Sequence, residues 1–338
     1  MQEDSGDLRA ASGQKICASD FGAVVLPKLP DLPGMISPSE CCYLFWAASR
    51  LLGAGCAVEV GSWLGRSSVH IAAGLAAGGW PTPLHCFDGF VWAPNDVSKS
   101  TLPLRPGEDF QHYFLQNTAS FSDRIWVHKT RIAQISWSGE PIELLFLDAP
   151  KRQVEIARCL EVFGPALIPG TSIIVAQDYL YFPAYSLAIC LHTLRDRLKL
   201  AHVVIDGSTV AFLLTGALDL ARERPADWEF RKWSAAKVEA AWDEILEPLP
   251  TSAQERLAPG RALHLYDCGA KAAALRAMRA LPMTPFQQDK IAQLARSHHY
   301  LGYPELFTAV GYPGSARRNL LARAKRLRDW ARRLRAAG

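Results

Sequence analysis

Short apolar runs alternate along the first two thirds of this chain with segments whose apolar residues recur every three or four positions. An apolar run of about four to eight residues is typical of a buried strand, and the wider spacing is typical of a helix with one apolar face. The predicted strands are residues 56–60, 84–88, 124–128, 141–148 and 171–178. The predicted helices are residues 42–52, with Ser37-Pro-Ser-Glu40 as the helix start, and residues 66–78, 109–121, 154–163 and 183–199. Further along the chain, residues 222–249, 271–281 and 289–300 are also predicted to be helical.

The last strands of this array follow a different pattern. Two apolar runs within residues 201–215 flank Asp206-Gly207, a dipeptide that favours a tight hairpin turn. Strands that are separated by helices form parallel sheets, whereas a hairpin joins antiparallel strands. The sequence therefore predicts an α/β fold whose mostly parallel sheet ends in an antiparallel hairpin.

The segments outside this array divide the chain into four expected parts. Residues 1–37 contain scattered Gly, Ser and Pro and are expected to form a loose lead-in to a main domain over residues 38–217. Residues 218–314 are expected to form a helical region, because helical patterns there are separated by Pro and Gly. Residues 315–338 are expected to form a separate amphipathic helix.

The terminal helix carries the basic charge of the chain. Residues 315–338 hold nine Lys or Arg and one acid, so the net charge of +4 divides into +8 here and −4 elsewhere. An apolar stripe with a basic back fits either an anionic membrane surface or packing against the protein or a second copy. Nucleic-acid binding is disfavoured because the remainder of the chain is acidic.

The N-terminus and the cysteines indicate a cytoplasmic protein. The basic helix also allows peripheral contact with the inner face of the membrane. The first residues are acidic and lack the apolar core of a signal peptide, and no apolar run reaches membrane-spanning length. The eight cysteines are scattered without a C-x-x-C pair, so neither a zinc spacing nor a disulfide framework is predicted.

A strand, a glycine turn and a helix come together at Cys56–Ser68, the opening unit of the predicted sheet. Open α/β sheets bind ligands at the carboxyl ends of their strands, and glycines there let the backbone approach a ligand. The spacing of Gly61 and Gly65 does not match the G-x-G-x-x-G fingerprint of dinucleotide-binding proteins. Nicotinamide-dependent oxidoreduction is therefore only a remote alternative.

The run from Val58 to Ser68 resembles the first motif of class I S-adenosylmethionine-dependent methyltransferases. It is most similar to the group that contains caffeoyl-coenzyme A, catechol and sugar O-methyltransferases, and the resemblance covers residues 38–216. It implies a Rossmann-like methyltransferase sheet and S-adenosylmethionine as the cofactor. The cofactor-binding residues that it implies are Glu59, Gly61, Ser62, Gly65, Ser67, Ser68 and Asp88.

Two further acids, Asp148 and Asp178, end adjacent central strands and are expected to meet at the same edge of the sheet. In the metal-dependent members of the group, acids at these positions hold a divalent cation, so the resemblance implies a possible Mg²⁺ site formed by Asp148 and Asp178. Asp148-Ala-Pro-Lys151 resembles the D-x-x-K pattern of the group, which places Lys151 beside the acceptor hydroxyl as a proton acceptor and makes Asp148 and Lys151 the catalytic candidates.

The chain departs from the group in two places. Tyr179 follows Asp178 where catechol-type enzymes have an asparagine ligand, and Pro150-Lys151 replaces the Asp-His of the sugar-modifying branch. We therefore expect either of two functions. The first is methyl transfer to a hydroxyl of a sugar, glycan or secondary metabolite, with residues 89–107 as a lid over the site. The alternative is a catalytically degenerate methyltransferase-like module that binds or scaffolds.

Overall fold

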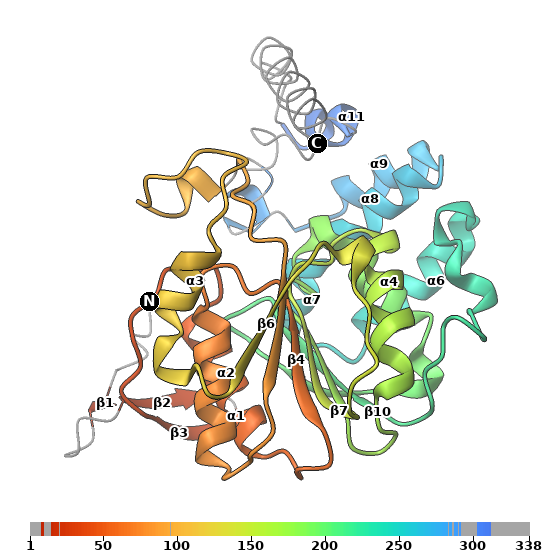
Figure 1. Ribbon diagram of the computed structural model, residues 1–338. Coiled ribbons are helices and arrows are strands. Elements are labelled where there is room, and N and C mark those ends of the chain that lie inside the picture. The colour runs from red at the N-terminus through yellow and green to blue at the C-terminus, as the bar shows by residue number, and fades with distance from the viewer. Residues whose placement is uncertain are drawn as a thin grey trace. The chain divides into compact units, whose positions relative to one another are not determined.

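The computed structural model describes residues 8–9, 15–19, 21–94, 96–282, 284–285, 287–289, 291 and 303–311 (Figure 1). The predicted basic helix at 315–338 and most of the helical pattern at 289–300 lie outside these residues. The chain divides into two compact units, one formed by residues 1–180 and 186–228 and the other by residues 181–185 and 229–338. No helix among the described residues is long and apolar enough to cross a membrane.

The first unit is built on a mixed sheet. Within the described residues it has seven strands in the order β6-β5-β4-β7-β8-β10-β9, and all neighbours are parallel except β10, which is antiparallel to β8 and β9. The strands are β4 Cys56–Val60, β5 Leu84–Asp88, β6 Ile125–Lys129, β7 Ile142–Leu147, β8 Ile173–Ala176, β9 Leu198–Val203 and β10 Val210–Leu214. The predicted parallel sheet with a closing antiparallel hairpin is confirmed.

Helices cover both faces of this sheet, which is why every residue of β4 and of β7 is buried. Figure 1 shows α1 and α2 on one side of the sheet and α4 on the other. The side chains agree, because Glu59 faces α2 whereas Phe87 of β5 contacts Phe163 of α4, with ring centroids 5.3 Å apart. The α-helices of this part are α1 Pro38–Ser49, α2 Arg66–Ala77, α3 Gln111–Asn117, α4 Gln153–Phe163 and α5 Tyr185–His192.

The predicted start of α1 is confirmed in detail. The backbone N–H of Glu40 donates to the Ser37 hydroxyl at 3.2 Å, and the Glu40 carboxylate accepts from the Ser37 N–H at 2.7 Å. This reciprocal pair is a capping box, which satisfies two N–H groups that a helix start leaves without intrahelical partners.

The segment ahead of α1 is more ordered than a loose lead-in. Within the described residues, three strands pair antiparallel in the order β1-β2-β3, over Leu8–Arg9, Lys15–Ser19 and Gly22–Leu26. Cys42 on α1 is disulfide-bonded, a pairing that the scattered cysteines did not indicate. The other described cysteine side chains are not in disulfides: Cys41, Cys56, Cys86, Cys159, Cys190 and Cys268.

Several predicted helices are too long. Helix α3 ends at Asn117, where the Thr118 hydroxyl donates to the Phe114 carbonyl at 2.8 Å and the chain tightens into a 3₁₀ turn. Helix α5 ends at His192, and the residues that follow form a 3₁₀ turn before β9. The 3₁₀ helices cover Asp96–Ser98, Ala119–Phe121, Ile132–Gln134, Gly164–Ala166, Phe182–Ala184, Arg195–Arg197, Ala226–Trp228 and Phe230–Lys232.

The second unit is helical where it is described, as expected. Its helices are α6 Ala235–Leu246, α7 Thr251–Leu257, α8 Pro259–Asp267, α9 Lys271–Arg279 and α11 Pro304–Ala309. The predicted helix over residues 222–249 begins only at Ala235, because Ser234 is its N-cap and accepts from the Lys237 N–H at 3.3 Å. Its core includes Trp242 and His264, both fully buried.

Candidate functional site

The glycine turn after β4 has the backbone that its sequence requires. Gly61 and Gly65 have φ values of +101° and +91°, and Trp63 between them has φ +42°. A Cβ on Gly61 would lie 2.6 Å from the backbone nitrogen of Ala149. The glycines therefore allow left-handed backbone and, at Gly61, a close approach between the ends of β4 and β7.

Glu59 binds the first residues of α2, which follow this turn. Its carboxylate is fully buried and accepts hydrogen bonds from the Ser67 and Ser68 hydroxyls and from the Cys86 thiol, the last at 3.2 Å. Burial raises the pKa of the Glu59 carboxyl, and the serine hydrogen bonds oppose that rise. Because the two hydroxyls are directed at Glu59, backbone N–H groups at the start of α2 are what this segment offers a ligand.

Asp88, at the end of β5, holds the opposite side of the turn. Its carboxylate accepts from the N–H groups of Ser62 and Trp63, both at 3.0 Å, and from that of Phe90 at 2.7 Å. Burial raises the pKa of Asp88, while these three N–H groups lower it. The carboxylate thus joins the glycine turn to the first residues of the segment expected to be a lid, and it keeps lone pairs for further donors.

The predicted acids at the ends of β7 and β8 do meet, and Lys151 lies between them. The Lys151 Nζ is 2.7 Å from Asp178 Oδ2 and 3.3 Å from Asp148 Oδ1. The cluster adjoins the glycine turn, since the Asp148 N–H donates to the Val60 carbonyl at 3.0 Å. Asp178 has φ +62°, a left-handed backbone that is uncommon for a residue other than glycine.

Two residues of this cluster were not predicted. The side-chain oxygen of Gln177, Oε1, lies 3.3 Å from Lys151 Nζ. The side-chain nitrogen, Nε2, donates to the Ser208 hydroxyl at 3.2 Å. That hydroxyl donates to Asp178 Oδ1 at 3.0 Å. Gln177 could have been predicted, because it precedes the strand-end acid Asp178. Ser208 gives no sequence signal, because it reaches Asp178 only through the fold of the hairpin.

The protonation states of the cluster follow from burial and from the charges of its members. Burial raises the pKa of Asp148 to about 7; the Asp178 and Glu59 charges add to the rise, and the Lys151 charge opposes it. Burial lowers the pKa of Lys151, but the two carboxylates outweigh burial and raise it overall. At neutral pH Lys151 is therefore an ammonium ion, and Asp148 is the group that titrates near pH 7.

A lysine lies between the two carboxylates for which the sequence suggested a divalent cation. The Lys151 ammonium occupies the space between the two carboxylates, within 3.3 Å of both. Tyr179 supplies no replacement for the missing asparagine, because it is buried with its ring packed against Phe212 at 5.4 Å. The cation of this cluster is the lysine, and Mg²⁺ at Asp148 and Asp178 stays a prediction.

Two tryptophans lie against the glycine turn. Trp63 stacks on Trp92, with ring centroids 5.8 Å apart, and Trp92 is fully buried at the base of residues 89–110. Backbone hydrogen bonds between Trp92, Gly107 and Glu108 close that base. Both indole N–H groups are buried without a hydrogen-bond partner among the described residues. Orphaned donors beside a glycine turn fit a bound ligand that carries acceptor atoms.

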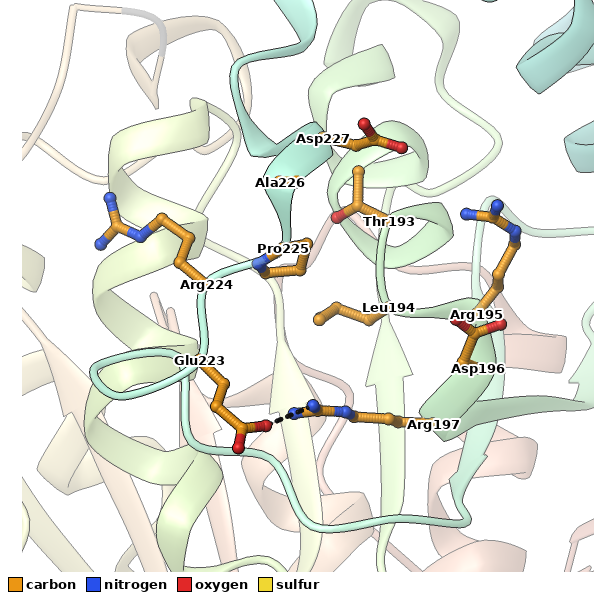
Figure 2. Close-up of a pocket in the computed structure, with 10 residues that line it drawn as sticks. All are labelled: Thr193, Leu194, Arg195, Asp196, Arg197, Glu223, Arg224, Pro225, Ala226 and Asp227. Atoms are coloured by element: carbon orange, nitrogen blue, oxygen red, sulfur yellow. Dashed lines mark hydrogen bonds and ion pairs between the residues drawn. The ribbon is translucent and has the colours of Figure 1, made fainter.

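A cavity elsewhere in the first unit contains none of the predicted residues. It measures about 360 Å³ and is lined by residues 193–197 and 223–227 (Figure 2). Its charged lining includes an ion pair between Arg197 and Glu223, with nitrogen and oxygen 2.6 Å apart. The residues predicted for the site therefore lie outside this cavity, at the carboxyl ends of β4, β5, β7 and β8.

Comparison with known proteins gives one match to a family. Residues 58–179 match the model of a methyltransferase domain, a range that contains every residue predicted for the site. No curated protein sequence matches the chain.

The solved structures that resemble the chain are distant. They include the O-methyltransferase NovP, 15% identical over 55% of this chain and 84% of that one, with a TM-score of 0.45. Rv0187 from MTB, cofactor-bound, is 18% identical over 55% and 84%, with a TM-score of 0.37. The methyltransferase PaMTH1 of Podospora anserina, bound to SAH, is 16% identical over 56% and 83%, with a TM-score of 0.39.

Proposed function

We propose that this chain, an S-adenosylmethionine-dependent methyltransferase by its matched domain, methylates a hydroxyl oxygen of a sugar, a glycan or a secondary metabolite. The observation that carries the choice of oxygen is the cluster of Lys151 with Asp148 and Asp178 beside the glycine turn. A hydroxyl must lose its proton to become methylated, and this cluster combines a proton acceptor with a cation.

The cofactor fits the residues around the turn. The N–H groups at the start of α2 suit its carboxylate, and Asp88 at the end of β5 suits its ribose hydroxyls. Gly61 and Gly65 give the turn its backbone, Ser62 donates its N–H to Asp88, and Glu59 fixes the orientation of Ser67 and Ser68. When bound, S-adenosylmethionine supplies an already activated methyl group, so the chain itself has only to position the acceptor and remove a proton.

Asp148 is the better proton acceptor of the cluster. A general base is most effective when its pKa lies near the working pH, and the pKa of Asp148 is about 7. A carboxylate oxygen of Asp148 would take the acceptor O–H proton and then release it to solvent. Lys151 keeps its proton and stabilises the developing negative charge on the acceptor oxygen. Asp178, held by Ser208, orients Lys151.

The test separates binding from turnover. Calorimetry of the full chain with S-adenosylmethionine is expected to show one site, and an acceptor panel of sugars and phenols is expected to yield methyl ethers. Asp148→Asn is expected to keep cofactor binding and lose about 10²- to 10⁴-fold in turnover. Absence of cofactor binding by the unaltered chain contradicts the function. Binding without turnover on every acceptor supports the alternative, a non-catalytic binding module.

A further inference from the structure

A second cluster of chemically active side chains lies at the amino ends of the strands, opposite the edge described above. Cys56 is the first residue of β4, His85 the second of β5, and Glu140 lies two residues ahead of β7. One ligand atom from each, a sulfur, a nitrogen and an oxygen, lies within 4.8 Å of the other two. Cys56 is fully buried, His85 is 5% exposed, and the Glu140 side chain is 44% exposed.

The hydrogen bonding of His85 leaves one ring nitrogen without a partner. Its Nδ1 lies 2.9 Å from His128 Nε2, whereas its Nε2 lies 3.6 Å from Glu140 Oε1 and has no hydrogen bond among the described residues. A neutral imidazole carries one N–H. If it is on Nδ1, the lone pair of Nε2 faces a carboxylate; if it is on Nε2, the carboxylate is beyond hydrogen-bond distance. A cation beside Nε2 satisfies both groups.

We propose that Cys56, His85 and Glu140 bind a zinc-class divalent transition metal, with water completing the coordination on the exposed side of Glu140. Thiolate, imidazole and carboxylate are the ligands that zinc takes in proteins, and three protein ligands with one open position is a common arrangement. In the tautomer of His85 that carries its proton on Nδ1, the ring donates to His128 and presents Nε2 to the metal, and His128 then has the usual role of a group behind a ligating histidine. The rings of Trp126 and Trp137 flank His85 at 5.0 and 4.8 Å.

This metal is structural in our proposal. It links the beginnings of β4 and β5 to the turn before β7, and the glycine turn lies at the other end of β4. Binding requires the Cys56 thiol to release its proton to solvent, so the affinity is expected to rise with pH. The proposal does not depend on methyl transfer.

Cobalt serves as the probe, because a cobalt–thiolate bond gives a near-ultraviolet charge-transfer band. The full chain, stripped of metal with a chelator under reducing conditions, is expected to bind one equivalent of Co²⁺ with that band. Cys56→Ser is expected to abolish the band, and Cys268→Ser, a thiol of the second unit, is expected to leave it. His128→Phe is expected to weaken the affinity about 10- to 100-fold.

Exposed Glu140 provides a variant that leaves the buried core intact. Glu140→Gln is expected to weaken Co²⁺ binding at least about tenfold with an unchanged circular dichroism spectrum, whereas Asp123→Asn, at an exposed position, is expected to bind as the native chain does. Absence of the band in the native chain, its survival in Cys56→Ser, or unchanged affinity in Glu140→Gln would each overturn the proposal.

Discussion

Asp148 is the single side chain whose environment sets the working pH that we expect. Its carboxylate must be ionised to accept a proton, and burial places its pKa at about 7. Turnover is therefore expected to be low below this pKa and to rise through about pH 7, which a profile of kcat/KM against pH measures. A rising limb near pH 4, the range of an ordinary aspartic acid, would assign the proton to another group.

Lys151 is expected to act as a fixed cation. Lys151→Met removes the charge that stabilises the acceptor oxygen and is expected to lower kcat about 10²- to 10³-fold, with little change in cofactor affinity. Lys129→Met, at an exposed lysine of β6, is the matched control. Added Mg²⁺ is expected to leave native turnover unchanged, because the cluster holds its own cation; turnover that requires added Mg²⁺ would support the predicted metal site.

The strand-end acids were predictable from sequence, because parallel strands place their carboxyl ends on one edge. The partners of those acids were not. Ser67 and Ser68 look like ligand-binding hydroxyls in the motif, yet they are directed at Glu59, whose burial depends on the packing of α2. Ser208 reaches Asp178 from a hairpin turn that lies 30 residues further along the chain. Hydrogen bonds between distant segments follow no local pattern.

At the scale of the elements, Glu40 joins the start of α1 to the turn of the β9–β10 hairpin. Besides capping α1, its carboxylate accepts from the Ser208 N–H at 2.8 Å and from the Thr209 hydroxyl at 2.7 Å. Its side chain passes so close to Gly207 that a Cβ there would lie 2.3 Å from it. One buried acid therefore sets the position of the turn that carries Ser208.

Glu40→Ala leaves the buried Thr209 hydroxyl and the partly buried N–H groups of Ser37 and Ser208 without this acceptor, and it is expected to lower the free energy of unfolding by about 2–4 kcal/mol. Urea denaturation measures the change. Asp123→Ala, at a side chain that is 77% exposed, is the control and is expected to cost under about 0.5 kcal/mol. A loss in Glu40→Ala no larger than in the control would show that the hairpin contacts contribute little.

Element types were predicted better than their ends. The capping box of α1 and the Asp206-Gly207 hairpin depend on neighbouring residues, so the sequence displays them. The predicted helix over residues 183–199 includes the start of β9. The apolar residues there fit the spacing of a helix as well as that of a strand. Pairing with β10 decides the conformation there, and pairing is a tertiary effect.

At the scale of the molecule, the second unit has a pH-sensitive core of its own. His264 is fully buried; its Nδ1 accepts from Trp242 Nε1 at 3.1 Å, and its Nε2–H donates to the Phe230 carbonyl at 3.0 Å. Both nitrogens are used by the neutral ring, and burial lowers the pKa of His264 to about 4. Between about pH 4 and pH 6.5, His264 therefore stays neutral in the folded unit and is protonated in the unfolded chain.

Stability is expected to fall as the pH drops from about 6.5 to about 4, because unfolded His264 then binds a proton that the folded ring does not. The loss from this residue is about 3 kcal/mol. It is measured as the difference between the native chain and His264→Gln in unfolding free energy at pH 7 and at pH 4. Equal losses in the two proteins would show that His264 is not the source.

The fold of the first unit was predicted in outline, since alternating strands and helices with a closing hairpin leave few topologies open. The boundary between the two units was harder to predict from the sequence. The structure separates its units after Trp228, whereas the sequence suggested a change of character near Leu218. Trp228 and Phe230 are buried in short 3₁₀ helices and Trp233 ends the second one, so their spacing matches neither an α-helix nor a strand.

The carboxylate of Asp88 accepts from two N–H groups of the glycine turn and from that of Phe90. Ligand binding at the turn is therefore expected to be coupled to the conformation of residues 89–110. A ligand that draws on the lone pairs of Asp88 changes its hold on Phe90, and an acceptor that orders residues 89–110 changes the affinity of the turn by the same factor. Either substrate, when it binds first, is then expected to change the affinity for the second by the same factor.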